Sequence, residues 1–252
     1  MSILSPTWPP PPAQIELGGS QVHIWCASLD IDQTTLSQLV ELLAKDEQER
    51  ANRFVFDRDR QHFIAARARL RLILSHYLNV EPQSLRFRYG PQGKPDLTGI
   101  NGGALSFNLS HSHGMALFAV TQERKIGVDV EWIRSIDDMD SIARRFFSKV
   151  EYQAYSALPL HQKPLGFFNC WTRKEAYIKA IGQGLTCPLS DFDVSLTPGQ
   201  PAKLLSIKDD PQAAELWSMT TLTPAAGYIG AICIEGQLPQ ISCWQSATPS
   251  PK

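Results

Sequence analysis

The sequence predicts an α+β fold in which two similar subdomains each pack helices on an antiparallel sheet. In both halves of the chain, apolar residues at helical spacing precede segments with the alternating pattern of strands. Both halves also contain a late pair of strand-like segments, at 115–132 and 216–235, that is typical of a hairpin. No internal repeat is strong enough to prove a duplication, so the similarity of the halves is one of pattern.

The composition is that of a soluble globular protein. At 252 residues the chain is long enough for one large domain or two small ones. Hydrophobic residues make up 43% and charged residues 19% of the sequence, which is ordinary for a folded domain. The net charge of -1 argues against a protein that coats nucleic acid or an anionic membrane.

Cysteine usage and the absence of targeting signals favour the cytoplasm. The five cysteines are odd in number and include no C-x-x-C pair, which is typical of reduced thiols rather than of a disulfide framework or a zinc ribbon. The sequence contains no run of about 18 apolar residues, so a transmembrane helix is not expected. The N-terminus lacks the basic and apolar regions of a secretory signal.

Proline marks both ends of the chain. Residues 1–12 contain five prolines, which remove backbone donors and favour an extended conformation, so a disordered tail is expected there. Residues 246–252 have the same character. Between the tails we expect an N-terminal subdomain at 13–124 and a C-terminal subdomain at 125–245.

In the first half, the pattern changes from strand to helices and back to strands. Residues 21–27 alternate as a strand, and Leu36 to Leu43 have helical spacing. From Asp57 a longer helical stretch carries an apolar stripe, and five arginines lie on its other face. We interpret most of these arginines as a solvated face, but one or two could reach an anionic ligand, because the planar guanidinium suits phosphate oxygens. Turn residues at 90–95 separate strand-like segments at 84–89 and 105–109, and Ser110–Gly114 follows as a polar turn.

The second half repeats this order. Ile142 to Phe147 is helical, and Ser148 with Glu151 forms a capping box that begins a short helix. Pro164 lies early in a helix that runs to about Ile181, where its missing donor is tolerated. The remaining strand-like segments are 192–196, 203–207, 216–222, 228–234 and 241–244.

Two acidic residues share one face of a strand. In Ile126–Trp132 the apolar residues take one face, whereas Asp129 and Glu131 take the other. Acidic residues are depleted in strands, so the pair needs an explanation. One explanation is a solvent-exposed face of a hairpin. The other is a pair of oxygen ligands for a cation on one rigid element.

A third carboxylate lies on an apolar helical stripe. Glu175 is four residues from Trp171 and three from Ile178, so it shares their face. A half-buried carboxylate requires a partner. Lys179, four residues later, would form an ordinary helix ion pair. Alternatively, a cation would be shared with Asp129 and Glu131, and Mg²⁺ is the best match because it prefers oxygen ligands and substrate phosphates.

A zinc site is not favoured. His111 and His113 form an H-x-H pair, but no third nitrogen or sulfur ligand follows at a useful spacing. His111 is better suited to donate a hydrogen bond to a phosphate.

Several short motifs together resemble the signatures of 4'-phosphopantetheinyl transferases, and specifically the large, monomeric type that activates surfactin synthetase. With the earlier Gly93–Pro95, the similarity spans roughly residues 45 to 193. Each motif is short, but their order and spacing are specific. The motifs are Phe107–His111, Gly127–Glu131, Phe146–Glu151 and Trp171–Lys179.

The resemblance implies an α+β pseudo-dimer with the active site in the cleft between its halves. It also implies that the 4'-phosphopantetheine arm of coenzyme A is transferred to a serine of an acyl or peptidyl carrier protein, with release of adenosine 3',5'-bisphosphate. By motif position, the resemblance implies that Mg²⁺ would be held by Asp129, Glu131 and Glu175. Phosphate charge would be neutralised by Lys174 and Lys179, and the phosphates would also contact Ser110 and His111. Lys94 would lie near the adenosine.

One region departs from the family pattern. Where the family often has a pair of basic residues, this chain has Glu47–Arg50, and only Arg50 keeps the basic character. Arg50 is therefore the remaining candidate there for binding the coenzyme.

For catalysis, Glu175 is the candidate base for the serine proton, while Lys179 and Asp129 are expected to act on the phosphoryl group.

A group of basic residues, Arg144, Arg145 and Lys149, is expected near the cleft entrance, where it would attract an acidic carrier-protein helix. The alternative is a scattered solvated patch. A catalytically silent coenzyme A-binding or interaction protein with the same fold is the alternative function. A different Mg²⁺-dependent phosphotransferase is disfavoured because no P-loop is present.

Overall fold

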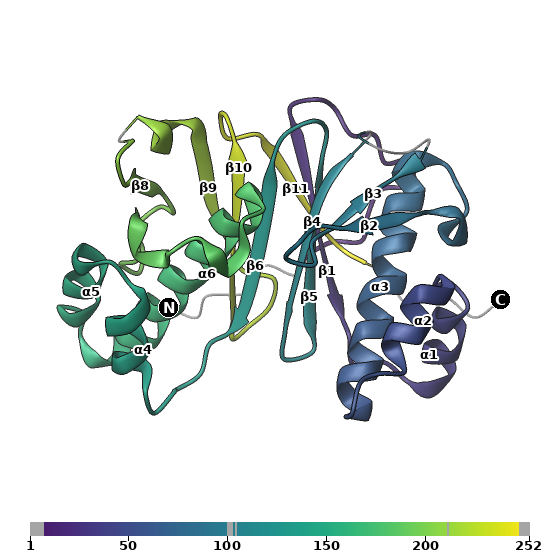
Figure 1. Cartoon of the computed structure of the whole chain (residues 1–252), viewed down its shortest axis with the longest axis horizontal. Coiled ribbons are helices and arrows are strands. Elements are labelled where there is room, and N and C mark those ends of the chain that lie inside the picture. Colours follow the sequence, from purple (N-terminus) through teal and green to yellow (C-terminus); the bar gives the residue numbers. More distant parts are fainter. Residues whose placement is uncertain (1–7, 100–102, 104, 211, 247–252) are drawn as a thin grey trace.

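The structure is a computed structural model that describes residues 8–99, 103, 105–210 and 212–246. In the first half, three helices and a small two-stranded sheet follow the first strand (Figure 1). A hairpin then completes this half. Its elements are β1 (Gln21–Ser28), α1 (Gln33–Val40), α2 (Lys45–Ala51), α3 (Asp57–Leu78), β2 (Phe87–Tyr89), β3 (Pro95–Leu97), β4 (Ser106–Ser112) and β5 (Met115–Thr121).

The second half has the same order of elements, followed by one additional strand. Its elements are β6 (Ile126–Trp132), α4 (Met139–Phe146), α5 (Lys149–Ser156), α6 (Lys163–Ile181), β7 (Phe192–Val194), β8 (Leu204–Ile207), β9 (Trp217–Leu222), β10 (Tyr228–Glu235) and β11 (Gln240–Gln245). Short 3-10 turns connect several of them.

Two main sheets stand at the centre of the molecule, and helices cover their outer sides (Figure 1). The first has the strand order β11-β1-β5-β4, and the second has the order β6-β10-β9. Apart from β11, both sheets are antiparallel and place the first strand of the half beside the last hairpin strand. The α+β class expected from the sequence is confirmed.

The expected hairpin at 115–132 is wrong. Strand β5 pairs with β4 and β1, whereas β6 pairs with β10 in the other sheet. The real hairpin joins β4 to β5 through His113 and Gly114, whose φ values of 46° and 80° are both positive. Positive φ at both central residues is the requirement of a two-residue type I' turn. The hairpin expected at 216–235, formed by β9 and β10, is confirmed.

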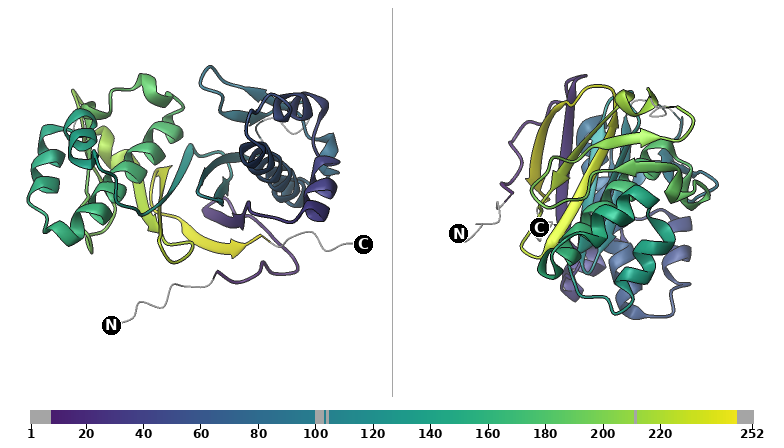
Figure 2. Two further views of the ribbon diagram at one scale, coloured as in Figure 1. Left: turned by 90° about the horizontal axis from the view of Figure 1, so that it is seen from below. Right: turned by 90° about the vertical axis from the view of Figure 1, so that its left-hand side faces the viewer.

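Strand β11 returns to the first sheet. It pairs in parallel with β1, so that Gln21 lies opposite Gln240 and Trp25 opposite Trp244. Figure 2 shows this strand running from the second half to the first. The expected C-terminal subdomain at 125–245 includes β11, and the division into subdomains stays a prediction.

The disordered tail expected at 1–12 is wrong for residues 8–12, which are the part of it that the structure describes. Trp8 is buried among apolar residues of both sheets, and the Pro9 carbonyl accepts a hydrogen bond of 2.8 Å from the Gln245 N–H. Burial of the indole fixes this segment although proline prevents it from joining a ladder. Ser246 likewise donates its N–H to the Cys26 carbonyl. The rest of both expected tails lies outside the described residues.

Three clusters of buried apolar residues form the core, and one of them joins the two halves. Each half has its own cluster of buried apolar residues between its helices and its sheet. A third cluster lies where the sheets meet and includes Leu117 from β5, Val128 from β6 and Ile232 from β10. This packing holds β4 and β6 side by side, which positions the cleft described below. Within the described part of the chain, no helix is long and apolar enough to span a membrane.

Candidate active site

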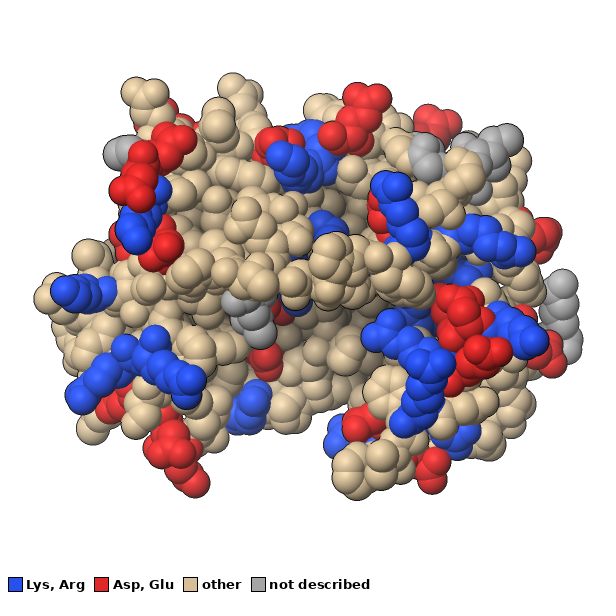
Figure 3. Space-filling model, viewed as in Figure 1, with Lys and Arg blue, Asp and Glu red and all other residues tan. Residues whose placement is uncertain are grey.

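A cleft of about 520 Å³ lies between the two halves. Figure 3 shows the hollow between them, with Lys and Arg atoms gathered on its right-hand side over the first half. Six of the residues singled out in the sequence line this cleft together, although they come from distant parts of the chain. They are Arg50, Lys94, Ser110, His111, Glu175 and Lys179.

Close packing of α6 on β6 creates the floor of the cleft. A Cβ atom at Gly127 would lie 2.0 Å from the Ala176 carbonyl oxygen and 2.4 Å from the Ala180 nitrogen. Only glycine permits this approach, since real Cβ atoms do not come so close to backbone. The helix therefore lies directly on the strand. This contact places Glu175 and Lys179 of α6 beside Asp129 of β6.

Side chains, rather than a backbone ladder, join β4 to β6 across the seam between the sheets. The Asn108 Oδ1 accepts from the Val128 N–H at 2.8 Å. Two residues further on, the Ser110 hydroxyl donates to Asp129 Oδ1 at 2.7 Å. After another two, the Ser112 hydroxyl donates to Glu131 Oε2 at 2.7 Å. The alternation of β4 thus aims three polar groups at β6 and fixes both carboxylates.

Asp129 is buried, with only 4% of its surface exposed. Its Oδ1 accepts from the Lys179 ammonium at 2.7 Å as well as from Ser110. Among the described residues, no group donates to its buried Oδ2. A buried oxygen without a partner is costly, so this atom is suited to receive a further ligand.

Glu175 carries a strongly perturbed carboxyl group. Its pKa is raised to about 7, mainly by burial and then by the charge of Asp129, while Lys179 lowers it and Glu131 adds a smaller increase. The three carboxylates therefore lie close enough to repel one another. Glu131 is half-buried and has an additional partner in Arg134, at 3.5 Å.

A metal site is not preformed. Among the described residues, no three acidic, histidine or cysteine side chains are arranged so that they could hold an ion. Instead, the Lys179 ammonium lies against Asp129 and the Ser110 hydroxyl. The donor set nevertheless suits a hard cation. Within the described part of the chain Asp129 Oδ2 has no donor, and burial together with the nearby acidic residues disfavours the ionised form of Glu175, which a cation would stabilise.

The expectation that Lys174 binds phosphate is wrong. Its side chain is fully buried in the second half, where the ammonium donates to the Leu189 and Phe192 carbonyls at 2.6 Å each. It also forms an ion pair of 2.8 Å with Glu151 Oε2. Glu151 in turn caps α5 and accepts from the Val194 N–H. Lys174 and Glu151 therefore tie α5, α6 and β7 together, away from the cleft.

Lys94 connects the two halves. Its ammonium donates to the Lys179 carbonyl at 2.7 Å and to the Ile126 carbonyl at 3.3 Å. The first of these lies in the last turn of α6, where unpaired carbonyls attract a cation. Burial is the main reason why the pKa of Lys94 is lowered. The side chain both lines the cleft and holds the end of α6 against the first half.

His111 is a neutral donor in the wall of the cleft. Partial burial, followed by the charge of Lys179, lowers its pKa below the usual value. The neutral imidazole, which this shift favours, has one N–H to donate.

Arg67 is a cleft residue that the sequence did not single out from the other arginines of its helix. The expected solvated face is wrong for Arg67, Arg69 and Arg71 of α3, which are all buried. That one or two of these arginines reach an anionic ligand stays a prediction. The Arg67 guanidinium makes bonds of 2.9 and 2.7 Å to Glu47 Oε1 and one of 2.8 Å to the Tyr89 hydroxyl. Glu47, which occupies the position where a basic residue was expected, thus fixes a different cation in the wall. Glu47 and Tyr89, the two partners of Arg67, are 20 and 22 residues away in the sequence, so no local pattern indicates these contacts.

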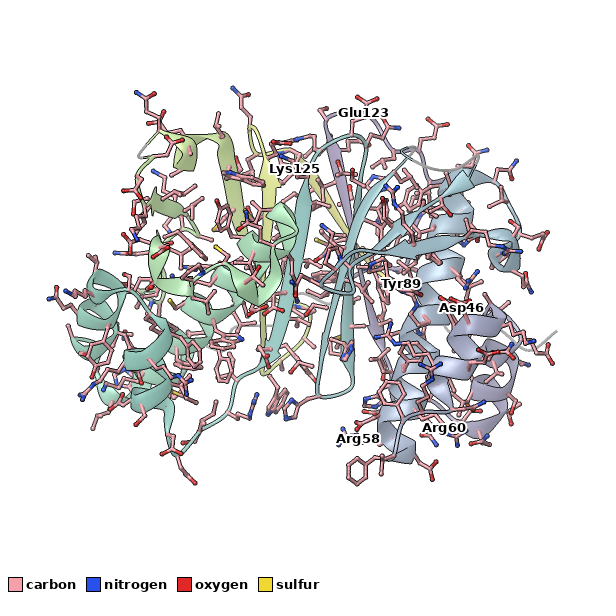
Figure 4. All side chains as sticks on the ribbon, in the orientation of Figure 1. Asp46, Arg58, Arg60, Tyr89, Glu123 and Lys125 are labelled. Atoms are coloured by element: carbon pink, nitrogen blue, oxygen red, sulfur yellow. The ribbon has the colours of Figure 1, made fainter. Side chains whose placement is uncertain are left out.

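Arg50 lies beside this group. Its guanidinium stands over the rings of Phe63 and Tyr89, at 5.3 and 5.8 Å from the ring centroids. Tyr89 lies on the side of the first half that faces the middle of the molecule (Figure 4). Two arginines are thereby held around one tyrosine in the wall of the cleft.

The basic residues expected at the cleft entrance lie elsewhere. Arg144 and Arg145 line a separate surface hollow with Asp140, and Arg144 donates to the Tyr152 hydroxyl. They belong to α4, and Lys149 begins α5, at the outer end of the second half (Figure 1). None of the three is among the described residues that line the cleft.

Comparisons with known proteins identify both halves. Residues 125–233 match the family model of the 4'-phosphopantetheinyl transferase superfamily, and residues 30–123 match that of the 4'-phosphopantetheinyl transferase N-terminal region. The chain is 42% identical to the 4'-phosphopantetheinyl transferase HetI of Nostoc sp. over 93% of this chain and 96% of that protein.

More distant relatives extend the similarity to other bacteria. The 4'-phosphopantetheinyl transferase psf-1 of Bacillus pumilus is 32% identical over 79% of this chain and 81% of its own. The 4'-phosphopantetheinyl transferase Sfp of Bacillus subtilis is 28% identical over 66% of this chain and 72% of its own.

Proposed function

We propose, from the premise that this chain belongs to the 4'-phosphopantetheinyl transferase superfamily, that the cleft binds coenzyme A and that Asp129, Glu175 and Lys179 act in the transfer. The chain is a 4'-phosphopantetheinyl transferase, which moves the phosphopantetheine arm of coenzyme A to a serine of a carrier protein. The observation that carries the assignment of residues is the contact of Lys179 with Asp129 on the floor of the cleft, where Asp129 Oδ2 has no donor among the described residues.

The two ends of the cleft suit the two ends of the coenzyme. Arg50 and Arg67 offer guanidinium groups, which match phosphate oxygens in geometry, for the nucleotide phosphates at one wall. Lys94 and the adjoining turn line the same cleft and would contact the adenosine. Ser110, His111 and Lys179, which also line it, would provide donors for the pyrophosphate.

In the reaction, the serine oxygen attacks the pyrophosphate phosphorus nearer pantetheine. A new P–O bond forms to serine, and the bond from that phosphorus to the bridging oxygen breaks, so the electron pair leaves with adenosine 3',5'-bisphosphate. Such transfer depends mainly on positioning and on neutralising charge at phosphoryl oxygens. The Lys179 ammonium supplies positive charge where that charge develops.

Glu175 receives the serine proton, directly or through a water. In the absence of a bound cation the pKa of Glu175 is about 7, so at neutral pH the group is partly ionised and can accept a proton.

Asp129, Glu131 and Glu175 would hold Mg²⁺. When bound, the ion would supply positive charge to the pyrophosphate and would relieve the repulsion among the three carboxylates. Lys179 would then exchange its contact with Asp129 for one with a phosphate oxygen.

The remaining expectations concern the whole molecule. The matching order of elements in the two halves supports a pseudo-dimer of two subdomains, with the site at their interface. We also propose that the enzyme is a monomer in the cytoplasm and that its carrier protein presents an acidic helix. All five cysteines are free thiols, in keeping with a reducing compartment.

The intact mass of an apo carrier protein tests the function. After incubation with this protein, coenzyme A and Mg²⁺, the carrier is expected to gain one phosphopantetheine. A protein that binds coenzyme A by calorimetry but modifies none of the fatty-acid, polyketide and peptide carriers offered would instead be a silent binding protein.

A further inference from the structure

We propose that an exposed apolar segment, Phe54–Val55–Phe56, is the surface on which the carrier protein docks. We call this segment, together with the adjoining Arg58, the docking ridge. The inference rests on the proposed function, since it names the surface through which the macromolecular substrate reaches the same cleft. It also moves the expected docking surface from the second half, where Arg144 and Arg145 lie, to the first.

The ridge is unusually apolar for an exposed segment. Phe54, Val55 and Phe56 are 37%, 89% and 70% exposed, and they are consecutive in the chain. Isolated exposed apolar residues are normal, but a contiguous group marks an interaction site. The ridge has a fixed base, because the Phe54 ring packs on Phe63, which itself lines the cleft.

A second hollow leads from the ridge to the acidic residues. It has a volume of about 450 Å³ and is lined by Phe54 and Arg58 at one end and by Ser112 and His113 at the other. It shares Arg50, Phe63 and His111 with the main cleft. Since the Ser112 hydroxyl is bonded to Glu131, the hollow ends beside the carboxylates. A protein seated on the ridge would thus present a side chain to the reaction site from outside.

The charges around the ridge favour an acidic partner. Arg53 and Arg58 are exposed, and Asp57 is paired with Arg60 at 3.0 Å. Asp59 also lines the hollow and offsets one of the two exposed arginines, so the balance of exposed charge at the ridge is still positive. Figure 4 places Arg58 at the lower end of α3, on the side of the central hairpin. Figure 3 shows basic atoms gathered on this side of the hollow. The fitting partner surface is therefore apolar with acidic residues around it, and a reactive serine near its centre.

Substitution of the ridge tests the proposal. The Val55→Ser/Phe56→Ser variant removes two exposed side chains, so its thermal unfolding should match that of the wild type. Its KM for apo carrier protein should rise by about 10-fold or more, as for loss of apolar interface anchors, whereas kcat and the KM for coenzyme A stay the same. Leu160→Ser is the matched control, since Leu160 is 84% exposed on the second half. That variant should leave all three constants unchanged.

A direct measurement of carrier binding tests the docking ridge independently of the transfer activity. Fluorescence anisotropy of a labelled apo carrier should report the same loss of affinity in the ridge variant without any transfer. If the wild type binds carriers but transfers nothing, the proposed function fails and the ridge stands. An unchanged carrier KM and affinity in the ridge variant would overturn the ridge. So would a concentration-dependent wild-type dimer that the ridge substitutions dissociate, because a second copy would then be its occupant.

Discussion

The Lys179 ammonium lies 2.7 Å from Asp129 Oδ1 and joins helix α6 to strand β6 at the floor of the cleft. The contact exists because Gly127 lets the helix lie on the strand and because Ser110 holds the carboxylate from the other sheet. Lys179 and Glu175 are four residues apart, so one helix face brings a cation and a carboxylate to the same position.

Glu175→Gln should reduce transfer and increase stability at the same time. Loss of the base is expected to lower kcat by about 10² to 10⁴. Because the folded-state pKa is raised to about 7, the ionised carboxylate opposes folding above that pH, and the neutral amide removes this penalty. Urea unfolding at pH 8 without divalent ions should therefore show a higher midpoint. Glu49→Gln, at an exposed site, is the control and should change neither quantity.

Gly127→Ala should separate α6 from β6. The new Cβ would overlap backbone atoms of Ala176 and Ala180, which cannot move away without displacing the helix. We expect a loss of about 3 kcal/mol or more in the free energy of unfolding, together with loss of transfer. Gly19→Ala is the matched control, because its Cβ would meet only the Gln122 side chain at 3.7 Å. Equal denaturation midpoints for the two variants would contradict the role of Gly127.

Lys174→Met should destabilise the protein without weakening coenzyme binding. It leaves Glu151 buried without its cation, which typically costs about 3–5 kcal/mol. The additional change Glu151→Gln should restore part of that loss. Where the folded fraction is still high, calorimetry should give the wild-type affinity for coenzyme A. An affinity at least tenfold weaker would return Lys174 to the binding site.

Arg67→Met should impair recognition of the nucleotide end of coenzyme A. Arg67 is also the buried partner of Glu47, so the variant should be less stable and is compared with wild type where the folded fraction is high. There the KM for coenzyme A is expected to rise by about 10-fold, as for loss of a charge-assisted phosphate contact, while kcat changes little. With 3'-dephospho-coenzyme A, wild type and variant should differ much less if Arg67 contacts the terminal phosphate. A similar loss with both substrates would assign Arg67 to another part of the ligand.

His23 should make the protein sensitive to mild acid. Burial lowers its pKa to about 4 from the ordinary 6.5, so the neutral imidazole is the form that the fold accepts. Its stabilising contribution is complete above pH 6.5, where neither state is protonated, and is lost as the pH falls towards 4. The full loss is about 3 kcal/mol. Unfolding free energies measured from pH 7 to 4 should fall less steeply for His23→Gln than for wild type, whereas the exposed control His76→Gln should follow wild type.

Much of the site could be predicted from the sequence, because its residues lie in regular elements. The alternation in β6 places Asp129 and Glu131 on one face, and four-residue spacing in α6 places Glu175 with Lys179. The same geometry argues against Lys174: a side chain five residues from Lys179 points about 140° away from it around the helix. Lys174 therefore faces the core.

Other features depend on contacts between distant parts of the chain. The partnership of Glu47 with Arg67 crosses two helices, and neither residue type indicates it locally. Strand β5 forms its hairpin with β4 rather than with β6 because the backbone at His113 is left-handed. Non-glycine residues seldom adopt this conformation, so the sequence does not indicate the turn. The return of β11 to β1 is set by which sheet has an unpaired edge, a property that exists only after the sheets form.

The pairing of Gln21 with Gln240 makes the second half an insertion within the first. The first sheet gains its outer strand only when everything between β5 and β11 has been made, so its last strand pairing is among the most non-local in the chain and is expected to form late. A chain divided after β5 would yield a first half whose β1 edge is bare and prone to join other strands. The two halves therefore resemble each other in the order of their elements without being separable pieces.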